Sequence, residues 1–507
     1  MKSSPSIPSI IASSLALAFS GLFAAPSIAA DSDQNTAPAA VEKEAATLHF
    51  GLEKIKLPGD ENMGMINTSY LIQIAPELYF GPSAFGAVSG KRGGFYTIGG
   101  ELLWRHPLVS KLTLDAGMYV GGGGGGTALV GGGLMLRPHA DLMWNFGGYR
   151  AGISASQVRF PNGHINSNQI GLVVDFDTDF LHTDAPAGEK NWPSSTRTGV
   201  GFDRAMAVFG RYQPRSNSQF INGAPLQQSI GYVGMRMERF LTPGVFVGIE
   251  ANGAGSGGVA GYAEYLATAG AEMPVFSDNF KVGTRFDLGM GGGGAISVGG
   301  GIMLKAGVYA SANLSKNLHV NVEGGMVDSP NGNFRSTYGS VALQWDLDHP
   351  FSQSSSSTVI ANEWIGGTQH YFSAARKDGS KRDMDNVTLQ LNRYLTDTVY
   401  LTGQAHSAYS GNAGGYSVGL IGMGYHSPKT SAGLYAGAEM LAGAAGGGGV
   451  DTNGGFLVQP SAYVGMQISK NLAAQLNVGR VKSLKGDLNS NLLGLGLSYS
   501  FGTIERH

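Results

Sequence analysis

Polar and apolar residues alternate along three related stretches of the chain. Residues 112–144 form a strand-like segment, a run of glycines and a second strand-like segment, and residues 282–312 and 434–466 repeat this order. Successive side chains of a strand point to opposite faces, so alternation gives each strand one polar and one apolar face. The recurrence makes the repeat the unit of structure.

The second strand of the first copy shows the split clearly. Arg137, His139 and Asp141 share one parity, whereas Leu142 and Trp144 share the other. The same division continues through the other two copies, and each repeat contains eight alternating segments. The pattern therefore predicts about twenty-four antiparallel strands in three repeats of eight.

The connections between the segments of the first repeat differ in length in a regular way. Short turns at residues 74–78, 106–110 and 145–147 alternate with loops that are mostly longer, or rich in glycine, at 57–67, 89–94, 121–126 and 160–168. This asymmetry is typical of outer-membrane barrels, in which the short turns face the periplasm.

Composition narrows the functional classes. Charged residues make up 14% of the chain and the net charge is -2, which excludes the basic footprint of a nucleic-acid-binding protein. The chain has no cysteine, so neither a disulfide framework nor a lipoprotein anchor is expected. Residues 1–29 have the positive start, apolar middle and small-residue cleavage site of a secretory signal.

The last segment of each repeat resembles the assembly signal of Gram-negative outer-membrane β-barrel proteins, of the form polar-x-Gly-x-x-apolar-x-aromatic. Residues 169–176 fit it fully, residues 340–347 fit with Ala342 and Leu347 as departures, and residues 494–501 fit with glycine at the polar place. The resemblance implies residence in outer-membrane lipid and recognition by the barrel-assembly machinery, and it identifies no individual family within the class. The residues that carry this assembly motif are Gly171, Phe176, Trp345, Leu347, Gly496, Tyr499 and Phe501.

These observations predict an all-β fold, a transmembrane antiparallel β-barrel built from three repeats of about eight strands. The expected divisions are a signal at 1–29, a disordered lead-in at 30–45, repeats at 46–178, 201–348 and 364–501, linkers at 179–200 and 349–363, and a tail at 502–507. A single large barrel is favoured over three tandem eight-stranded barrels, although the linkers are longer than ordinary turns. The choice matters because eight strands give a filled interior, whereas sixteen or more leave an aqueous channel.

The polar parity predicts which side chains face the lumen. Both charge signs are present in comparable numbers, so no selective field for anions or cations is expected. The predicted lumen-lining residues are Glu101, Asp115, Arg137, His139, Asp141, Arg150, Arg285, Asp287, Lys305, His319, Asn321, Glu323, Glu439, Gln459, Gln475 and Asn477.

Other chemistry is sparsely represented. None of the glycine runs is followed by Lys-Ser/Thr and a helical pattern, so phosphate binding is not expected. His139 with Asp141, and His319 with Glu323, have the spacing of a base with a carboxylate, but buried polar contacts explain them equally well. We expect no enzymatic activity, no cofactor and no metal site, since two ligands are too few for zinc.

The leading functional expectation is a channel or export conduit for polar solutes such as saccharides. The alternative is a non-transporting outer-membrane scaffold or adhesin made of three plugged eight-stranded barrels. A third hypothesis is a secreted, glycine-rich, self-assembling β protein. The expected partners are outer-membrane lipid, the barrel-assembly machinery and a polar solute, and no nucleic acid.

Overall fold

The computed structural model describes residues 41–183, 197–352 and 356–507. Its named elements are 24 strands, all in antiparallel pairs. The signal at 1–29 lies outside the described residues, as do most of the lead-in and the centre of the first linker. No helix among the described residues is long and apolar enough to cross a membrane.

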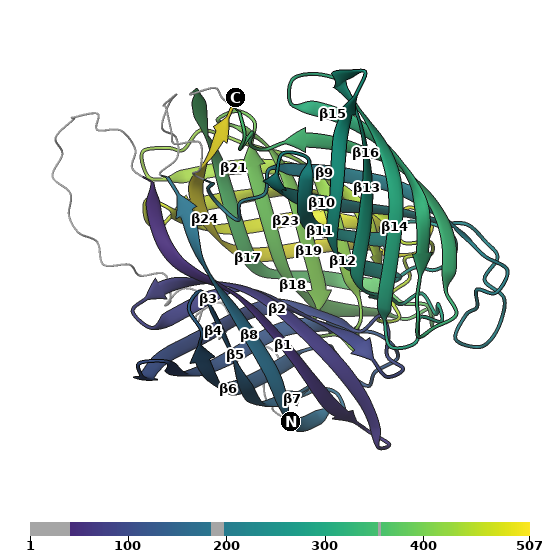
Figure 1. Ribbon diagram of the computed structural model, residues 1–507. Coiled ribbons are helices and arrows are strands. Elements are labelled where there is room, and N and C mark those ends of the chain that lie inside the picture. The colour runs from purple at the N-terminus through teal and green to yellow at the C-terminus, as the bar shows by residue number, and fades with distance from the viewer. Residues whose placement is uncertain (1–40, 184–196, 353–355) are drawn as a thin grey trace.

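The strands form three closed sheets of eight (Figure 1). Barrel 1 contains β1(Glu42–Leu57), β2(Glu61–Ala75), β3(Leu78–Ser89), β4(Tyr96–Val109), β5(Leu112–Gly124), β6(Met135–Asn145), β7(Tyr149–Arg159) and β8(Asn166–His182). Barrel 2 contains β9(Arg204–Pro214), β10(Ile230–Thr242), β11(Val245–Ala254), β12(Ala263–Val275), β13(Ser277–Gly292), β14(Ile302–Asn313), β15(Leu318–Asp328) and β16(Arg335–Asp346). Barrel 3 contains β17(Ser357–Ala375), β18(Lys381–Tyr394), β19(Val399–Ala408), β20(Ser417–His426), β21(Leu434–Gly446), β22(Phe456–Gln467), β23(Leu472–Ser483) and β24(Asn489–Arg506).

Each barrel closes by pairing its own first and last strands. Strand β1 pairs with β8, β9 with β16, and β17 with β24. The prediction of three eight-stranded repeats is confirmed, but the preference for one large barrel is wrong. Alternation is the same for both arrangements, so it could not distinguish them. The linkers supply the chain that is needed to begin a new barrel, which is why they exceed the ~2 to 6 residues of an ordinary turn.

Several strands extend beyond the predicted boundaries. Strand β1 begins inside the expected lead-in, β8 continues to His182 inside the first linker, and β17 begins at Ser357 inside the second. The expected tail at 502–507 is mostly strand, because β24 continues to Arg506. These ends mix polar and apolar residues without regular alternation, so hydrophobic alternation does not reveal their backbone pairing.

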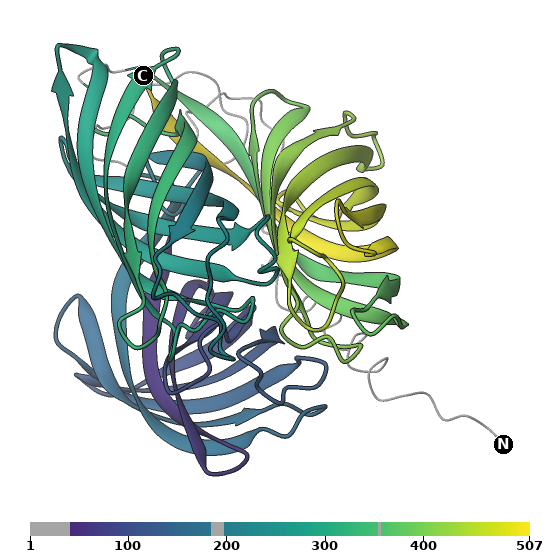
Figure 2. The ribbon, with the colours of Figure 1, turned by 90° about the vertical axis from the view of Figure 1, so that its right-hand side faces the viewer.

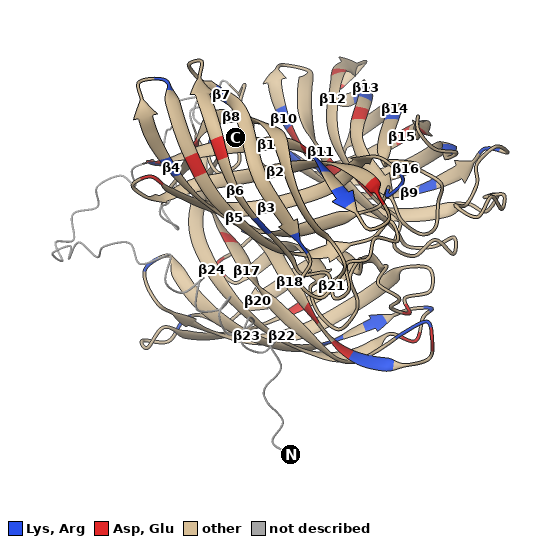
Figure 3. Ribbon diagram, turned by 90° about the horizontal axis from the view of Figure 1, so that it is seen from below, with Lys and Arg blue, Asp and Glu red and all other residues tan. Residues whose placement is uncertain are grey.

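The two faces of each strand follow the predicted alternation. In β15, Asn321 and Glu323 are buried inside the barrel while Val322 between them is 57% exposed. In β22 the same holds for Gln459, which is fully buried, and Val464, which is 55% exposed. Figure 3 shows few charged positions on the strands, which are mostly tan. The outer surface of each barrel is therefore largely apolar.

The barrels are grouped around a common centre and do not form a row (Figures 1 and 2). Strand β3 of barrel 1 contacts β13 and β14 of barrel 2; β10 and β11 of barrel 2 contact β21 of barrel 3; and β18 and β19 of barrel 3 contact β4 and β5 of barrel 1. In repeat terms, the second and third strands of one barrel meet the region of the fifth strand of the next. The contacts are head-to-tail, and they close after three barrels.

The glycine-rich loops make this arrangement possible. We call the loops at residues 90–95, 125–134, 255–262, 293–301, 409–416 and 447–455 the glycine cap. Within it, Gly93 N donates to Gly299 O at 3.0 Å and Gly414 N donates to Gly131 O at 3.0 Å, each between two barrels. The cap thus joins the barrels backbone to backbone.

Three equivalent glycines show how close this approach is. A Cβ atom at Gly301 would lie 2.6 Å from Ala87 O, one at Gly455 would lie 2.1 Å from Ala254 O, and one at Gly133 would lie 2.4 Å from Ala408 O. Real Cβ atoms do not come this near to a carbonyl oxygen. Glycine is therefore required at these positions by the neighbouring barrel, in accordance with its role where two backbones approach closely.

The opposite end of the assembly is tied together by the extension of β24. Gly502 exchanges backbone hydrogen bonds with Thr183, at the end of barrel 1. Arg506 forms an ion pair with Asp348, at the end of barrel 2. Barrel 3 contributes β24 itself, so residues 502–506 contact all three barrels. The residues that follow the aromatic position of the assembly motif thus have a structural role.

Candidate functional site

The lumen of barrel 1 contains two groups of paired charges. In the first, His139 lies between Glu101 and Asp141, with its ring nitrogens 3.0 Å from a carboxylate oxygen of each. Nearby, Arg137 binds Glu53 at 3.1 Å. All five side chains are almost fully buried. This predicted His-carboxylate pair is real, but it is enclosed by the barrel.

The second group in barrel 1 lies toward the short turns. Arg105 binds Asp115 at 2.7 Å and also contacts Asp175. His49 Nδ1 is 2.7 Å from the same Asp175 carboxylate, and Arg150 is 3.6 Å from it. The predicted lumen residues Asp115 and Arg150 are thus linked through Arg105 and Asp175.

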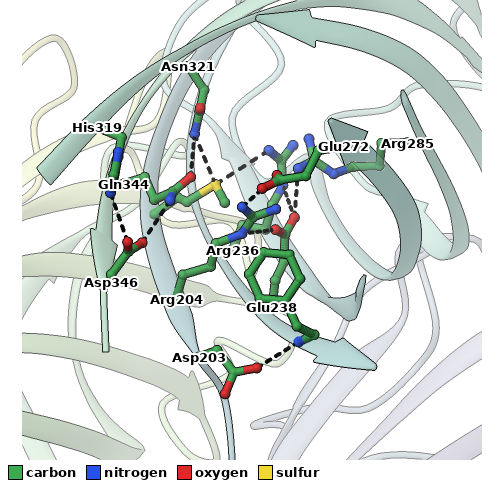
Figure 4. Close-up of polar contacts among 12 residues, drawn as sticks. Asp203, Arg204, Arg236, Glu238, Glu272, Arg285, His319, Asn321, Gln344 and Asp346 are labelled. Atoms are coloured by element: carbon green, nitrogen blue, oxygen red, sulfur yellow. Dashed lines mark hydrogen bonds and ion pairs between the residues drawn. The ribbon is translucent and has the colours of Figure 1, made fainter. Parts of the chain in front are cut away.

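Barrel 2 has the densest charge network (Figure 4). Arg285 contacts Glu238 at 2.6 Å and also Glu323, while Arg236 reaches Glu323 at 3.1 Å and also contacts Glu250. Each of these side chains is nearly fully buried. A buried charge is tolerated when oppositely charged partners surround it, and this network meets that requirement.

Lys305 and Asp287 occupy the same lumen. Lys305 Nζ is 2.6 Å from Glu250 and lies over the ring of Tyr338, 4.6 Å from its centroid. Asp287 is fully buried and is the cross-strand neighbour of Lys305. Asp287, predicted as lumen-lining, is therefore inside the barrel, on β13 next to the strand β14 that carries Lys305.

Nearer the short turns of barrel 2, the predicted pairing of His319 with Glu323 is not found. His319 instead contacts Asp346 at 2.8 Å (Figure 4). Its other ring nitrogen contacts Asn313 at 2.6 Å. Asn321 donates to Gln344 at 2.9 Å. Glu323 is turned toward arginines, which satisfy a carboxylate better than a distant imidazole does.

Barrel 3 uses amides and phenols where the other barrels use cations. Glu439 accepts hydrogen bonds from Gln390 at 2.7 Å, from Tyr400 at 2.8 Å and from Gln404 at 3.0 Å. Gln475 donates to Glu363 at 3.2 Å. Among the residues that the structure describes, neither carboxylate has a Lys or Arg partner within ion-pair distance.

Two further predicted residues of barrel 3 also face inward. Gln459 accepts from Tyr371 at 3.3 Å, and Asn477 lies half-buried on β23. All sixteen predicted lumen residues are thus buried or half-buried.

An aromatic and aliphatic plug fills the loop end of each barrel. In barrel 1, Phe85 packs on Tyr119 with ring centroids 4.7 Å apart, and Phe95 packs on Phe160 at 6.0 Å. Residues at the position of Phe95, namely Tyr262 and Tyr416, enter the plugs of barrels 2 and 3. Each follows directly after a glycine of the cap. The same short loop therefore contacts the neighbouring barrel and seals its own.

The assembly-motif residues lie on the closing strands β8, β16 and β24. Phe176 is 47% exposed on the outer face of barrel 1. Phe501 is instead buried between barrels, where it packs against Phe180 and Trp364 at centroid distances of 5.2 and 5.1 Å. Gly171, Trp345, Leu347, Gly496 and Tyr499 accompany them on the same three strands or directly after them.

Sequence reasoning missed several lumen partners that its own rule could have found. His49 and Glu53 lie on one parity of β1, and Arg236 and Glu238 lie on one parity of β10. These segments alternate as strictly as those that were used. The signal that would have identified them is the alternation of polar and apolar residues in β1 and β10, the first or second strand of a repeat.

A large apolar space lies between the barrels, outside their lumens. We call it the central chamber; its volume is about 1690 Å³, and all three barrels contribute to its wall. Outward-facing residues form much of the wall, among them Ile72 of barrel 1, Met235 and Ala251 of barrel 2, and Leu389 and Ala405 of barrel 3. The wall also includes cap glycines at one end and the β2–β3 and β22–β23 turns at the other. Sequence patterns could not reveal this space, because it depends on how the barrels pack.

The described residues contain no group of three or more His, Cys, Asp or Glu side chains arranged to hold a metal ion. The His-carboxylate contacts of the lumens are therefore pairs or short chains of ion-paired groups.

Comparison with known proteins identifies no family. No protein-family model matches the chain, and no curated protein matches it. The solved structures that match include the outer-membrane protein OpdK of Pseudomonas aeruginosa, with 10% identity, a TM-score of 0.21, and coverage of 91% of this chain and 99% of that one. The siderophore receptor PirA of Acinetobacter baumannii matches with 10% identity, a TM-score of 0.27, and coverage of 92% and 81%.

The names of these two matches describe an outer-membrane protein and a siderophore receptor. TM-scores this low mean that the overall arrangements differ. The matches therefore carry no argument about what this chain does.

Proposed function

We propose that the protein is an integral outer-membrane protein whose three barrels span the bilayer together. The outward faces support this, because they are apolar along strands long enough to cross, and because closed barrels leave no unpaired edge in hydrocarbon. In this orientation the short turns face the periplasm and the glycine cap faces outward. Assembly-machinery recognition through the three closing strands belongs to the same proposal.

We further propose that the individual barrels do not pass polar solutes. The observation that carries this is the combination of an aromatic plug and a paired polar lumen in every barrel. Eight-stranded barrels have interiors that side chains can fill, and these side chains are buried. The resulting function is that of a sealed, three-barrel scaffold. Its buried histidines lack access to a substrate, so the proposal includes no catalysis.

Transport is the second candidate, and the central chamber is the observation that favours it. A route along this chamber would follow the apolar outer faces of the barrels, and it would require the glycine-rich loops at one end of the chamber to separate. It would suit an apolar or amphipathic cargo better than a saccharide, because the wall offers few hydrogen-bonding groups in its middle section.

Two measurements test these proposals. After cell lysis, the folded protein should sediment with the outer membrane; recovery in the periplasmic supernatant or in the medium would overturn membrane residence. In planar bilayers the purified protein should show no steady ion conductance. Insertion is checked separately by protease protection of the turns in vesicles. A stable open conductance of the inserted protein would reject the sealed barrels.

A further inference from the structure

The central chamber has the features of a lipid-binding site. It is larger than the ~300 to 1000 Å³ of ordinary small-molecule pockets. Its charged wall residues are Glu42, Glu44 and Lys470, all at the end near the short turns. The rest of the wall is apolar side chains, glycines and a few neutral polar groups. The space is thus apolar over most of its depth and polar at one end.

The opposite end is closed by protein backbone. Gly94, Gly124, Gly261, Gly415 and Gly446 of the cap region line that end of the chamber. These glycines are packed against the backbone of a neighbouring barrel, as with Gly446, where a Cβ atom would lie 2.1 Å from Gly261 N. An occupant therefore enters from the short-turn end, which is periplasmic under the proposed orientation.

The wall also limits the chemistry of the occupant. Every barrel is closed, so the strands that surround the chamber have no free edge for pairing with a peptide. A polypeptide there would carry unpaired backbone groups into an apolar space, which is unfavourable. An acyl chain has no such groups and is as apolar as the wall. An empty apolar space would lose the contacts that such a chain makes with the wall.

We propose that the central chamber binds the acyl chains of a phospholipid from the periplasmic leaflet, with its head group at the short-turn end. This inference rests on the proposed outer-membrane residence. It assigns a ligand to the space between the barrels and makes that lipid part of the three-barrel unit.

Bound lipid can be measured directly. The full protein is purified from outer membranes, washed extensively in mild detergent, and analysed by native mass spectrometry and by lipid extraction. We expect phospholipid to remain with the wild type. The double variant Ala251→Phe/Ala405→Phe places two rings in the chamber and should lose most of the retained lipid.

The matched control is Ala155→Phe, which adds a ring to the outer face of β7, away from the chamber. It should keep the wild-type amount of lipid. A wild type without retained lipid, equal retention in the chamber-filling variant, or equal loss in the control would each overturn the proposal, as would a co-purifying peptide that the filling variant displaces. Sedimentation with the outer membrane is scored on the same samples, so failure of membrane residence is distinguished from failure of lipid binding.

Discussion

Gly446, the last residue of β21 and the neighbour of the glycine cap, leads to a sharp prediction about a single methyl group. In Gly446→Ala, the added Cβ would lie 2.1 Å from Gly261 N and 2.6 Å from Ala260 C, both in the neighbouring barrel. Favourable carbon contacts are ~3.5 to 4.0 Å, so barrels 2 and 3 must separate by roughly 1 Å. These atoms are backbone and cannot rotate away. Overpacking of this kind costs about 1 to 3 kcal/mol.

The chain provides a matched control for this change. Gly419 lies on β20 of the same barrel, and a Cβ there would meet nothing within 4 Å. Replacing a strand glycine with alanine where there is room should stabilise by about 0.5 to 1 kcal/mol. Gly419→Ala should therefore raise the urea midpoint of unfolding in detergent, whereas Gly446→Ala should give a midpoint below that control by the overpacking cost. Equal midpoints for the two variants would refute the close packing of barrels 2 and 3 at the cap.

Four other changes test the remaining features. A Cβ at Gly253 would lie 2.8 Å from Ala444 Cβ, nearer than the ~3.5 to 4.5 Å of a disulfide, so Gly253→Cys/Ala444→Cys should form a disulfide across barrels 2 and 3 in this cysteine-free chain once the two strands separate by about 1 Å; failure to oxidise would contradict their contact. Glu238→Gln should destabilise by up to about 3 kcal/mol because Arg204 and Arg285 each lose one of two carboxylate partners, whereas Glu439→Gln changes a carboxylate that has no cationic partner and should change the unfolding midpoint far less; the reverse order would refute the assigned networks. Deletion of residues 502–507 should leave barrel 3 closed, with heat-modifiable migration, but lower the yield of that disulfide; an unchanged yield would show that the β24 extension does not hold the barrels together. Burial raises the pKa of Asp203, just before β9, to about 6, so its contribution to stability falls as pH rises from about 4 to 6, by at most about 1.4 kcal/mol per unit; Asp203→Asn should remove this loss, and identical pH profiles of unfolding would rule it out.

The sequence was sufficient for the strands and for their inward faces. Strict alternation at Arg137, His139 and Asp141 placed these side chains in a lumen because period-two patterning directly encodes which face is buried. It did not reveal that Arg137 pairs with Glu53, since the two residues are far apart in the chain and meet across the barrel. Partners across a lumen depend on register and barrel radius, and alternation specifies neither.

The alternation pattern also could not predict how each barrel closes or how the three barrels pack together, for a different reason. Barrel 1 closes where β1 pairs with β8, with Leu48 opposite Phe176. The sequence pattern of β8 would be the same if β8 paired instead with the first strand of the next repeat. In the sequence, each glycine run simply lies between two strand-like segments of one repeat. Their main constraint comes from a neighbouring barrel, and a constraint of this kind is visible only once two repeats are placed side by side.

The three contacts between barrels are equivalent, and this equivalence explains what is gained by joining the barrels in one chain. Each contact joins the Ala87, Ala254 or Ala408 carbonyl of one barrel to the cap glycine of the next, so the interface is head-to-tail and closes after three units. Three separate eight-stranded proteins with this interface could form the same ring. Joining them in one chain raises their effective concentration, so that weak contacts suffice. The lumens differ, with an arginine network in barrel 2 and an amide network in barrel 3, whereas the cap glycines are alike in all three barrels because each barrel meets the same kind of neighbour.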